Sequence, residues 1–343
     1  MGITTDLRVS GQKFQYVPTL RTKAGEIAAL KNLHAQVKQR IVPILQITPT
    51  ISANFATSLA AAWSGRPIIL DGIAQAQNGS AKEFNLLFKD LGNSGVPTLP
   101  LVETGANPTY VAAVFNARNQ FTPGLALRVQ LTQVANAQQW LAQAGGSPLE
   151  TDLIIDCGHV AEIDPQLIAP VAINVLQSAA PTLISWRSVT LSSSAAPKDA
   201  SLLNHGPNLV PRRDWQLWST IAPHFPSLHF GDYGIAHRDL TEPPGFAMAN
   251  ATVTPRYTVN DAWLIRKGRS TRGVNGQPMP LQYHGHAQAL AADPNFGQVP
   301  DCWADAEIAQ IAARGGAGKA GSRETWVGLG LNRHISFVCH QLP

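Results

Sequence analysis

Polar side chains with chemical potential recur where short apolar stretches of the sequence end. These positions are Lys23, Gln46, Asp71, Glu103, Arg128, Asp156, the run Ser192-Ser193-Ser194, and Asp232. A carboxylate that is buried at such a position is costly unless it is paired with a cation or bound to a metal. The repeated placement therefore predicts that several of these side chains converge on one site.

One interpretation of this set is catalytic. Four carboxylates could hold a divalent metal through oxygen ligands, and nearby cations could neutralise a phosphate. The predicted catalytic residues are Asp71, Glu103, Asp156 and Asp232, and the predicted substrate-binding cations are Lys23, Arg128 and Lys198. This hypothesis describes a metal-assisted hydrolase of a phosphorylated or nucleotide substrate. The alternative is structural. In a barrel formed by these apolar stretches, the charges could form a ring of ion pairs that closes one end, or they could be exposed in loops.

The segment 192–199 adds Lys198 and Asp199 to the candidate site. It follows the seventh apolar stretch and is rich in Ser and Ala, and Pro197 restricts its backbone. Loops after the seventh and eighth strands of a barrel often form a phosphate site. We therefore expect Lys198 to reach the barrel mouth towards Asp232. The alternative is that Asp199 caps a short turn and that Lys198 is solvated.

A second candidate surface lies in the C-terminal third of the sequence. It is a basic loop that contains Arg266, Lys267, Arg269 and Arg272. Together with Trp263 and Trp303, which could stack on bases, this loop would suit nucleic acid or a partner protein. Arg269 and Trp263 are the predicted binding residues here. The alternative is a solvated loop with both tryptophans in the core.

The elements that would position these residues follow a βα rhythm. Eight short β-branched apolar stretches recur, at residues 16–22, 41–47, 67–71, 96–102, 125–131, 152–157, 181–191 and 228–233. Their hydrophobicity is continuous, which is typical of parallel strands buried on both faces. Amphipathic stretches lie between most of them, and two of these begin with Asn107-Pro108 and Asp164-Pro165, typical helix starts.

This pattern predicts an α/β protein of the (β/α)₈ TIM-barrel type, and an open doubly wound parallel sheet is the alternative. No Gly-rich phosphate turn follows the first strand, which favours the barrel. We predict a barrel over residues 14–244. Residues 245–343 are predicted to form an α+β elaboration packed on it, with antiparallel strands at 251–268 and helices at 281–292 and 302–314.

Composition restricts the class of protein further. The net charge is +4 and only 14% of residues are charged, so a nucleic-acid partner is permitted but not required. Three widely spaced cysteines argue against a zinc ribbon and against a disulfide framework. The first residues lack the apolar core of a signal peptide, and no apolar run approaches the ~18 residues of a membrane helix. We expect a cytoplasmic protein with no membrane partner.

Several motifs in fixed order resemble the Beta protein family of satellite phages and prophages. They include Tyr16-Val17-Pro18 near the start, Ser194-Ala195-Ala196-Pro197-Lys198-Asp199, Val210-Pro211-Arg212-Arg213-Asp214-Trp215, Phe230-Gly231-Asp232-Tyr233-Gly234, Trp263-Leu264-Ile265-Arg266-Lys267-Gly268, and Asn332-Arg333-His334-Ile335. The resemblance covers residues 16–341. Two positions depart from the family pattern: Pro300–Asp305 replaces an aromatic-Ser-Trp-Gly-Asp segment, and Arg333 stands where the family often has a second His.

The resemblance implies a role in anti-phage defence. Members of the family occur in defence cassettes of the Gop–Beta–cII type, beside a lethal effector and a regulator. Other proteins of the cassette are therefore the expected partners. The sequence therefore leaves three hypotheses. The resemblance implies a defence component, the charges at the strand ends suggest a barrel hydrolase, and the basic loop suggests a sensor or scaffold without catalysis.

Overall fold

The computed structural model describes residues 15–76, 79–122, 124–240, 252–274 and 276–343. They form two compact units that alternate along the chain. The barrel unit contains Gln39–Ala195, Arg213–Tyr233 and the described part of Met1–Lys23. The sheet–helix unit contains Ala24–Lys38, Ala196–Arg212 and the described part of Gly234–Pro343. The expected boundary at residues 244–245 lies outside the described residues, and the packing of the C-terminal part on the barrel stays a prediction.

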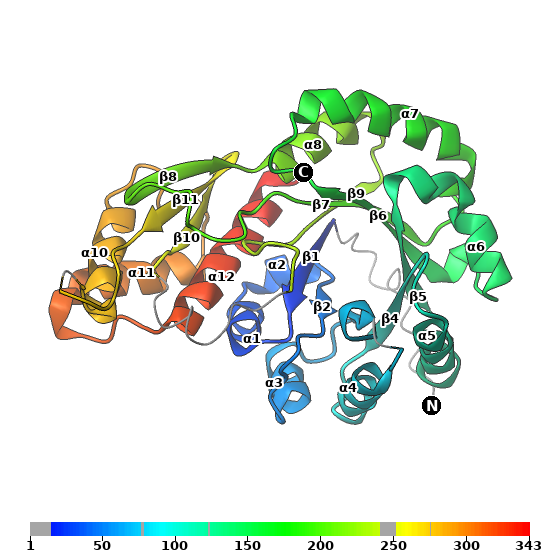
Figure 1. Ribbon diagram of the computed structural model, residues 1–343, viewed down its shortest axis with the longest axis horizontal. Helices are drawn as coiled ribbons and strands as arrows, with labels where there is room; N and C mark the ends of the chain where they lie inside the picture. The colour runs from blue at the N-terminus through cyan, green and yellow to red at the C-terminus, as the bar shows by residue number, and fades with distance from the viewer. Residues whose placement is uncertain (1–14, 77–78, 123, 241–251, 275) are drawn as a thin grey trace. The chain divides into compact units, whose positions relative to one another are not determined.

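The barrel unit is a closed ring of eight parallel strands (Figure 1). They are β1 (Tyr16–Arg21), β2 (Ile44–Gln46), β3 (Ile68–Asp71), β4 (Thr98–Glu103), β5 (Leu125–Gln130), β6 (Thr151–His159), β7 (Ser188–Ser194) and β9 (Leu228–Asp232). The (β/α)₈ prediction is confirmed. The open doubly wound sheet is wrong, because β9 pairs with both β7 and β1 and leaves the ring without an edge.

Helices connect most of these strands. They are α3 (Phe55–Ala62), α4 (Lys82–Asn93), α5 (Pro108–Phe121), α6 (Ala137–Gln143), α7 (Pro165–Leu183) and α8 (Arg213–Ile221), with short 3₁₀ turns such as η1 (Ile73–Ala76). The predicted starts of α5 and α7 are present, since Asn107 and Asp164 each accept a hydrogen bond from the backbone N–H two residues on. The seventh strand was predicted at residues 181–191, but β7 begins only at Ser188. The predicted start was too early because the uncharged, apolar end of α7 resembles a strand.

The inside of the barrel is an apolar layer contributed by strands. A cluster of buried residues there contains Val17, Val42, Ile44, Ile69, Leu99, Leu101, Ala126 and Ile154, and Ile73 of η1 packs against it. Side chains alternate between the two faces of a strand. Residues that lie two positions beyond these, towards the carboxyl ends of the strands, therefore also point inward.

The sheet–helix unit is built on three antiparallel strands. They are β8 (Gly206–Pro211), β10 (Arg256–Val259) and β11 (Ala262–Lys267), in the order β10-β11-β8. The helices are α1 (Ala24–Lys31), most of α2 (Ala35–Gln39), α10 (Met279–Ala291), α11 (Trp303–Arg314) and α12 (Arg323–Gln341). The predicted antiparallel strands and helices of this region are confirmed, whereas β8 was not predicted. None of the helices among the described residues is long and apolar enough to cross a membrane.

Three successive residues of α12 join this helix to other elements of the sheet–helix unit. Asn332, Arg333 and His334 are all fully buried. Asn332 donates to the carbonyl oxygen of Ala29 in α1 (3.1 Å) and accepts from the backbone N–H of Ala304 in α11 (3.2 Å). The Nδ1 atom of His334 contacts the hydroxyl of Thr258 in β10 (2.9 Å). The polar triplet of the family motif is therefore structural.

Arg333 makes the strongest polar contacts of this triplet. Its guanidinium forms an ion pair with Asp305 (2.9 Å), donates to the carbonyl oxygen of Thr258 (3.1 Å) and lies against the rings of Tyr257 and Phe337. The hydroxyl of Tyr257 donates to the other oxygen of Asp305 (2.8 Å). Burial raises the pKa of Asp305, while Arg333 and Tyr257 act in the opposite direction.

Removing one partner of this buried pair should be strongly destabilising. We expect Arg333→Leu to lower the free energy of unfolding by about 3–5 kcal/mol, because Asp305 is left buried without a counter-charge. Urea unfolding followed by circular dichroism measures the change. The double variant Arg333→Leu/Asp305→Leu should recover part of the loss. A double variant less stable than the single one would contradict this account.

His286 should make stability depend on pH. Its side chain is buried, and burial, followed by the charges of Arg266 and His205, lowers its pKa from 6.5 to about 4. The unfolded chain therefore binds a proton more readily than the folded one. The contribution of His286 to the free energy of unfolding should be fully present above about pH 6.5. It should fall by roughly 3 kcal/mol as the pH drops towards 4.

The test compares unfolding of the protein and of His286→Gln across this pH range. The variant should show a shallower decline below about pH 6.5, since position 286 no longer binds a proton. Parallel curves for the two proteins would show that His286 is not the source of the pH dependence.

Candidate active site at the mouth of the barrel

A polar layer lies directly above the apolar inside of the barrel. Five residues each lie two positions beyond an inward-facing apolar residue of the same strand. They are Gln46, Asp71, Glu103, Arg128 and Asp156. Arg21 continues the same alternation in β1. Polar side chains at or near the carboxyl ends of β1 to β6 thus face one space.

Arg128 is the centre of this layer. Its Nη1 atom lies 2.8 Å from Oδ2 of Asp71. Its Nε atom donates to Oε2 of Glu103 (2.9 Å), and its Nη2 atom forms an ion pair with the same oxygen at 2.8 Å. Glu103 and Arg128 are also register partners of β4 and β5. One guanidinium therefore joins the ends of three adjacent strands.

The surroundings hold Arg128 in its charged form. Burial on its own would lower the pKa of Arg128, but Asp71, Tyr233, Glu103 and Asp156 raise it, and the net pKa is well above the usual value. Asp71 is itself fixed, since Oδ2 also accepts from the Gln46 amide (3.2 Å) and Oδ1 from the backbone N–H of Ile73 (3.1 Å). This part of the layer is preorganised.

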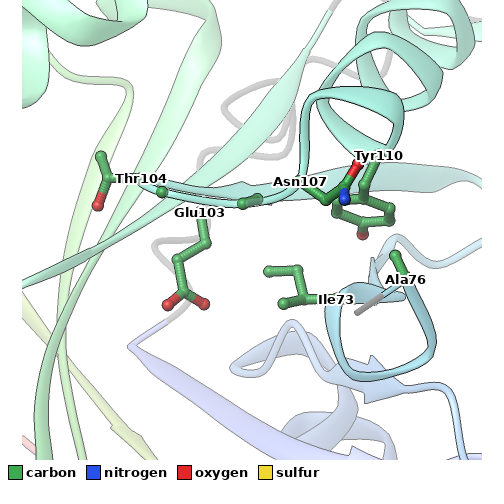
Figure 2. Close-up of a pocket in the computed structure, with 8 residues that line it drawn as sticks. Ile73, Ala76, Glu103, Thr104, Asn107 and Tyr110 are labelled. Atoms are coloured by element: carbon green, nitrogen blue, oxygen red, sulfur yellow. The ribbon is translucent and has the colours of Figure 1, made fainter. Parts of the chain in front are cut away.

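A cavity of about 390 Å³ opens beside Glu103. It lies between the end of β4, the turn η1 and the start of α5. The lining residues are Ile73, Ala76, Glu103, Thr104, Gly105, Ala106, Asn107 and Tyr110. Figure 2 shows the carboxylate of Glu103 and the side chain of Ile73 on the same side of the segment that leads from β4 to α5. The volume is within the usual range for small-molecule sites.

Tyr110 forms an apolar wall of the cavity. Its hydroxyl donates to the carbonyl oxygen of Leu101 (2.9 Å) and accepts from the backbone N–H of Gly72 (2.9 Å). Burial, followed by the charge of Asp71, raises the pKa of Tyr110 well above its usual value, so the phenol stays neutral. Gly72 permits this contact, because a Cβ atom there would lie 3.0 Å from Phe84 and 3.1 Å from the Tyr110 ring.

Asp156 and Asp232 occupy different environments. Asp156 follows the inward alternation of β6 and accepts from the backbone N–H of Gly158 (2.8 Å). Asp232 accepts from the hydroxyl of Tyr16 (2.7 Å), whose ring stacks on Phe230. Tyr16 has the opposite alternation to the inward-facing Val17, so Asp232 points outward from the barrel. Its expected place among the converging carboxylates was wrong for this reason.

The loop residues Lys198 and Asp199 belong to the sheet–helix unit. Lys198 forms an ion pair with Asp239, and its side chain is 57% exposed. Asp199 is exposed and accepts from the backbone N–H of Ser201 (2.7 Å), and this hydrogen bonding lowers the pKa of Asp199. The contact of Asp199 is the one expected if this residue caps a short turn. A role of either residue in binding stays a prediction.

The other predicted binding residues are dispersed. Lys23 is half-buried just beyond the end of β1, and Arg269 is exposed after β11. Trp263 is only 1% exposed, and its Nε1–H points to Nδ1 of His334 at 3.4 Å. The expectation that Trp263 is available for stacking is wrong, because the residue belongs to a buried core. Trp303 is half-buried.

The described residues contain no group of three or more His, Cys, Asp or Glu side chains arranged to hold a metal ion. Arg128 occupies the space between Asp71 and Glu103 instead, and Asp232 lies on the other face of its strand. The four predicted ligands thus do not form one metal-binding group.

Sequence reasoning missed the residues that shape the cavity. Ile73, Asn107 and Tyr110 are ordinary members of a turn and a helix start, and their types do not signal a site. The available signal was positional: the segment after a barrel strand borders the active-site face.

Comparisons with known proteins find a family model and a phage protein that match most of the chain. A family model described as "Beta protein" matches residues 16–340. "Protein beta" of Enterobacteria phage P4 is 21% identical over 351 residues, which cover 96% of this chain and 94% of that protein. Among solved structures, two mutant tryptophan synthase α-subunits of Pyrococcus furiosus give TM-scores of 0.39 and 0.37 at 10% and 12% identity, covering 65% and 66% of this chain and 88% of each of theirs.

Removing Arg128 should have a much larger effect than removing an arginine whose partner carboxylate is exposed. We expect Arg128→Met to lower the free energy of unfolding by about 3–5 kcal/mol at neutral pH, since Asp71 and Glu103 lose their cation. The loss should shrink towards about pH 5, because the uncompensated carboxyls acquire raised pKa values and take up protons.

The matched control is Arg118→Met. Arg118 pairs with Glu150, whose side chain is 47% exposed, so this change should cost only about 1 kcal/mol. Chemical unfolding of both variants at two pH values gives the comparison. Equal losses for the two variants would refute the special role of Arg128.

Proposed function

Because the chain belongs to the Beta protein family, we propose that it is a component of a prophage-encoded anti-phage defence system. We further propose that it acts in the cytoplasm by binding a small ligand at the mouth of its barrel. The observation that carries this proposal is the cavity beside Glu103. Family membership supports the biological setting, and the cavity supports the mode of action.

Three features favour a ligand site over a purely structural ion-pair ring. The cavity is large enough for a small molecule. Its polar wall is held in place by the Arg128 ion pairs, so a ligand would meet a preorganised surface. Glu103 keeps a 30% exposed side chain although it is paired with Arg128. A residue that served only to seal the barrel would have no need of this exposure.

Hydrolysis is a second candidate function that the same residue supports. Arg128 contacts only Oε2 of Glu103, and the structure gives Oε1 no hydrogen bond among the described residues. A carboxylate with one oxygen fixed and the other open can act as a general base towards a bound substrate or water. In either case Glu103 is the residue on which function depends, and other cassette proteins would be the partners that respond.

The test is Glu103→Gln in the native gene cassette. Glutamine keeps the size of the side chain but loses its charge, so we expect loss of protection in plaque assays across a phage panel. Stability should fall by only about 1 kcal/mol, since the Glu103 side chain is partly exposed and the glutamine oxygen can still accept a hydrogen bond from Arg128. Arg128 keeps its ion pair with Asp71 in this variant.

The control is Glu83→Gln, which removes an exposed carboxylate from α4. It should leave protection unchanged. Full protection by the Glu103→Gln variant, at normal protein levels, would reject the cavity as the functional site.

A further inference from the structure

We propose that the ligand of this cavity is an organic cation, namely a small molecule that carries a protonated amine on an apolar body. The inference rests on the proposed ligand-binding function of the site. An organic cation differs from the phosphate ligand expected from the sequence. The reason is that the charged side chain lining the cavity, Glu103, is a carboxylate.

Glu103 gives the cavity its negative side. Among the described residues that line the cavity, Glu103 alone carries a charge. Both of its contacts with Arg128 use Oε2. Oε1 thus remains available to accept a hydrogen bond from an ammonium group. A charge-assisted hydrogen bond of this kind is among the stronger polar contacts in proteins.

Arg128 is poorly placed to bind a phosphate. Its Nε and Nη1 atoms already donate to Glu103 and Asp71, and its Nη2 atom lies 2.8 Å from Oε2 of Glu103. A phosphate that approached Arg128 would lie beside both carboxylates. Repulsion between the phosphate and these carboxylates in a partly buried space opposes this arrangement.

The start of α5 does not provide an anion site, although helix N-termini often do. Its first residue, Pro108, has no N–H group. The N–H of Thr109 donates to the side chain of Asn107 (2.9 Å), and the N–H groups of Tyr110 and Val111 donate to the backbone oxygen of Asn107 (2.9 and 3.0 Å). The donors that would bind a phosphate are therefore already used.

The remaining walls favour an apolar body. Ile73 and Ala76 contribute aliphatic surface, and the ring of Tyr110 contributes an aromatic one. The Tyr110 hydroxyl is saturated by Leu101 and Gly72, so this side offers no polar anchor. A ligand with one cationic end and one apolar end satisfies both sides of the cavity.

Three probes with the same body and different head groups test the inference. They are phenethylamine, 2-phenylethanol and 2-phenylethyl phosphate, which carry a cation, a neutral hydroxyl and an anion. Binding to the purified full chain is measured by calorimetry or protein-observed NMR at neutral pH. We expect the amine to bind most tightly, and the phosphate to bind least.

The variants assign the binding to Glu103. Glu103→Gln should weaken amine binding roughly tenfold to a hundredfold, as expected for loss of a charged hydrogen bond. Glu83→Gln should leave it unchanged. The inference is overturned if the phosphate binds as tightly as the amine, if no amine binding is detected, or if Glu103→Gln binds the amine as well as the parent protein.

The two proposals can fail separately. Loss of protection by Glu103→Gln in cells, without amine binding in solution, would leave the functional site standing and reject the ligand class. Amine binding that depends on Glu103, combined with normal protection by Glu103→Gln, would leave the ligand class standing and reject the functional role.

Discussion

The ion-pair cluster around Arg128 constrains the barrel more than any other contact. Burying the charges of Asp71 and Arg128 is costly, and it is tolerated because the two groups pair with good geometry and Glu103 adds a second carboxylate to Arg128. Asp71, Glu103 and Arg128 lie at the ends of β3, β4 and β5, and all must point inward for these contacts to form. A slip of one residue in any of the three strands would turn its charged side chain outward, against the helices. The cluster therefore specifies strand register as well as the polarity of the site.

The barrel was predictable because its strands are buried on both faces. Continuous apolar stretches identify such strands, and a polar residue at each end locates the mouth. The same property hides the direction of individual side chains. Phe230 and Gly231 give no contrast between an inner and an outer face, so the sequence could not indicate that Asp232 points away from Asp71 and Glu103. The contact of Asp232 with Tyr16, 216 positions away, decides this orientation.

The candidate site was predictable only in its charged half. Asp71, Glu103 and Arg128 were visible as charges at strand ends, but their mutual pairing was not, since pairing depends on distances across neighbouring strands. The strand after β7, namely β8, was not predicted for a related reason. Residues 206–211 contain two prolines and little β-branched character, yet they form β8 because β11 offers a partner strand. Long-range pairing of this kind overrides local propensity. It also explains why Trp263, in the middle strand of that sheet, is buried.

The contact between Asn332 and Ala29 has a consequence for synthesis of the protein. It joins α12, near the end of the chain, to α1, near its beginning, across 303 positions. At ~5–20 residues per second, the ribosome needs roughly 15–60 s to add the intervening chain. During that time α1 has left the ribosome but lacks the helix that covers it in the finished protein. The sheet–helix unit can therefore be completed only after α12 has been synthesised and has left the ribosome.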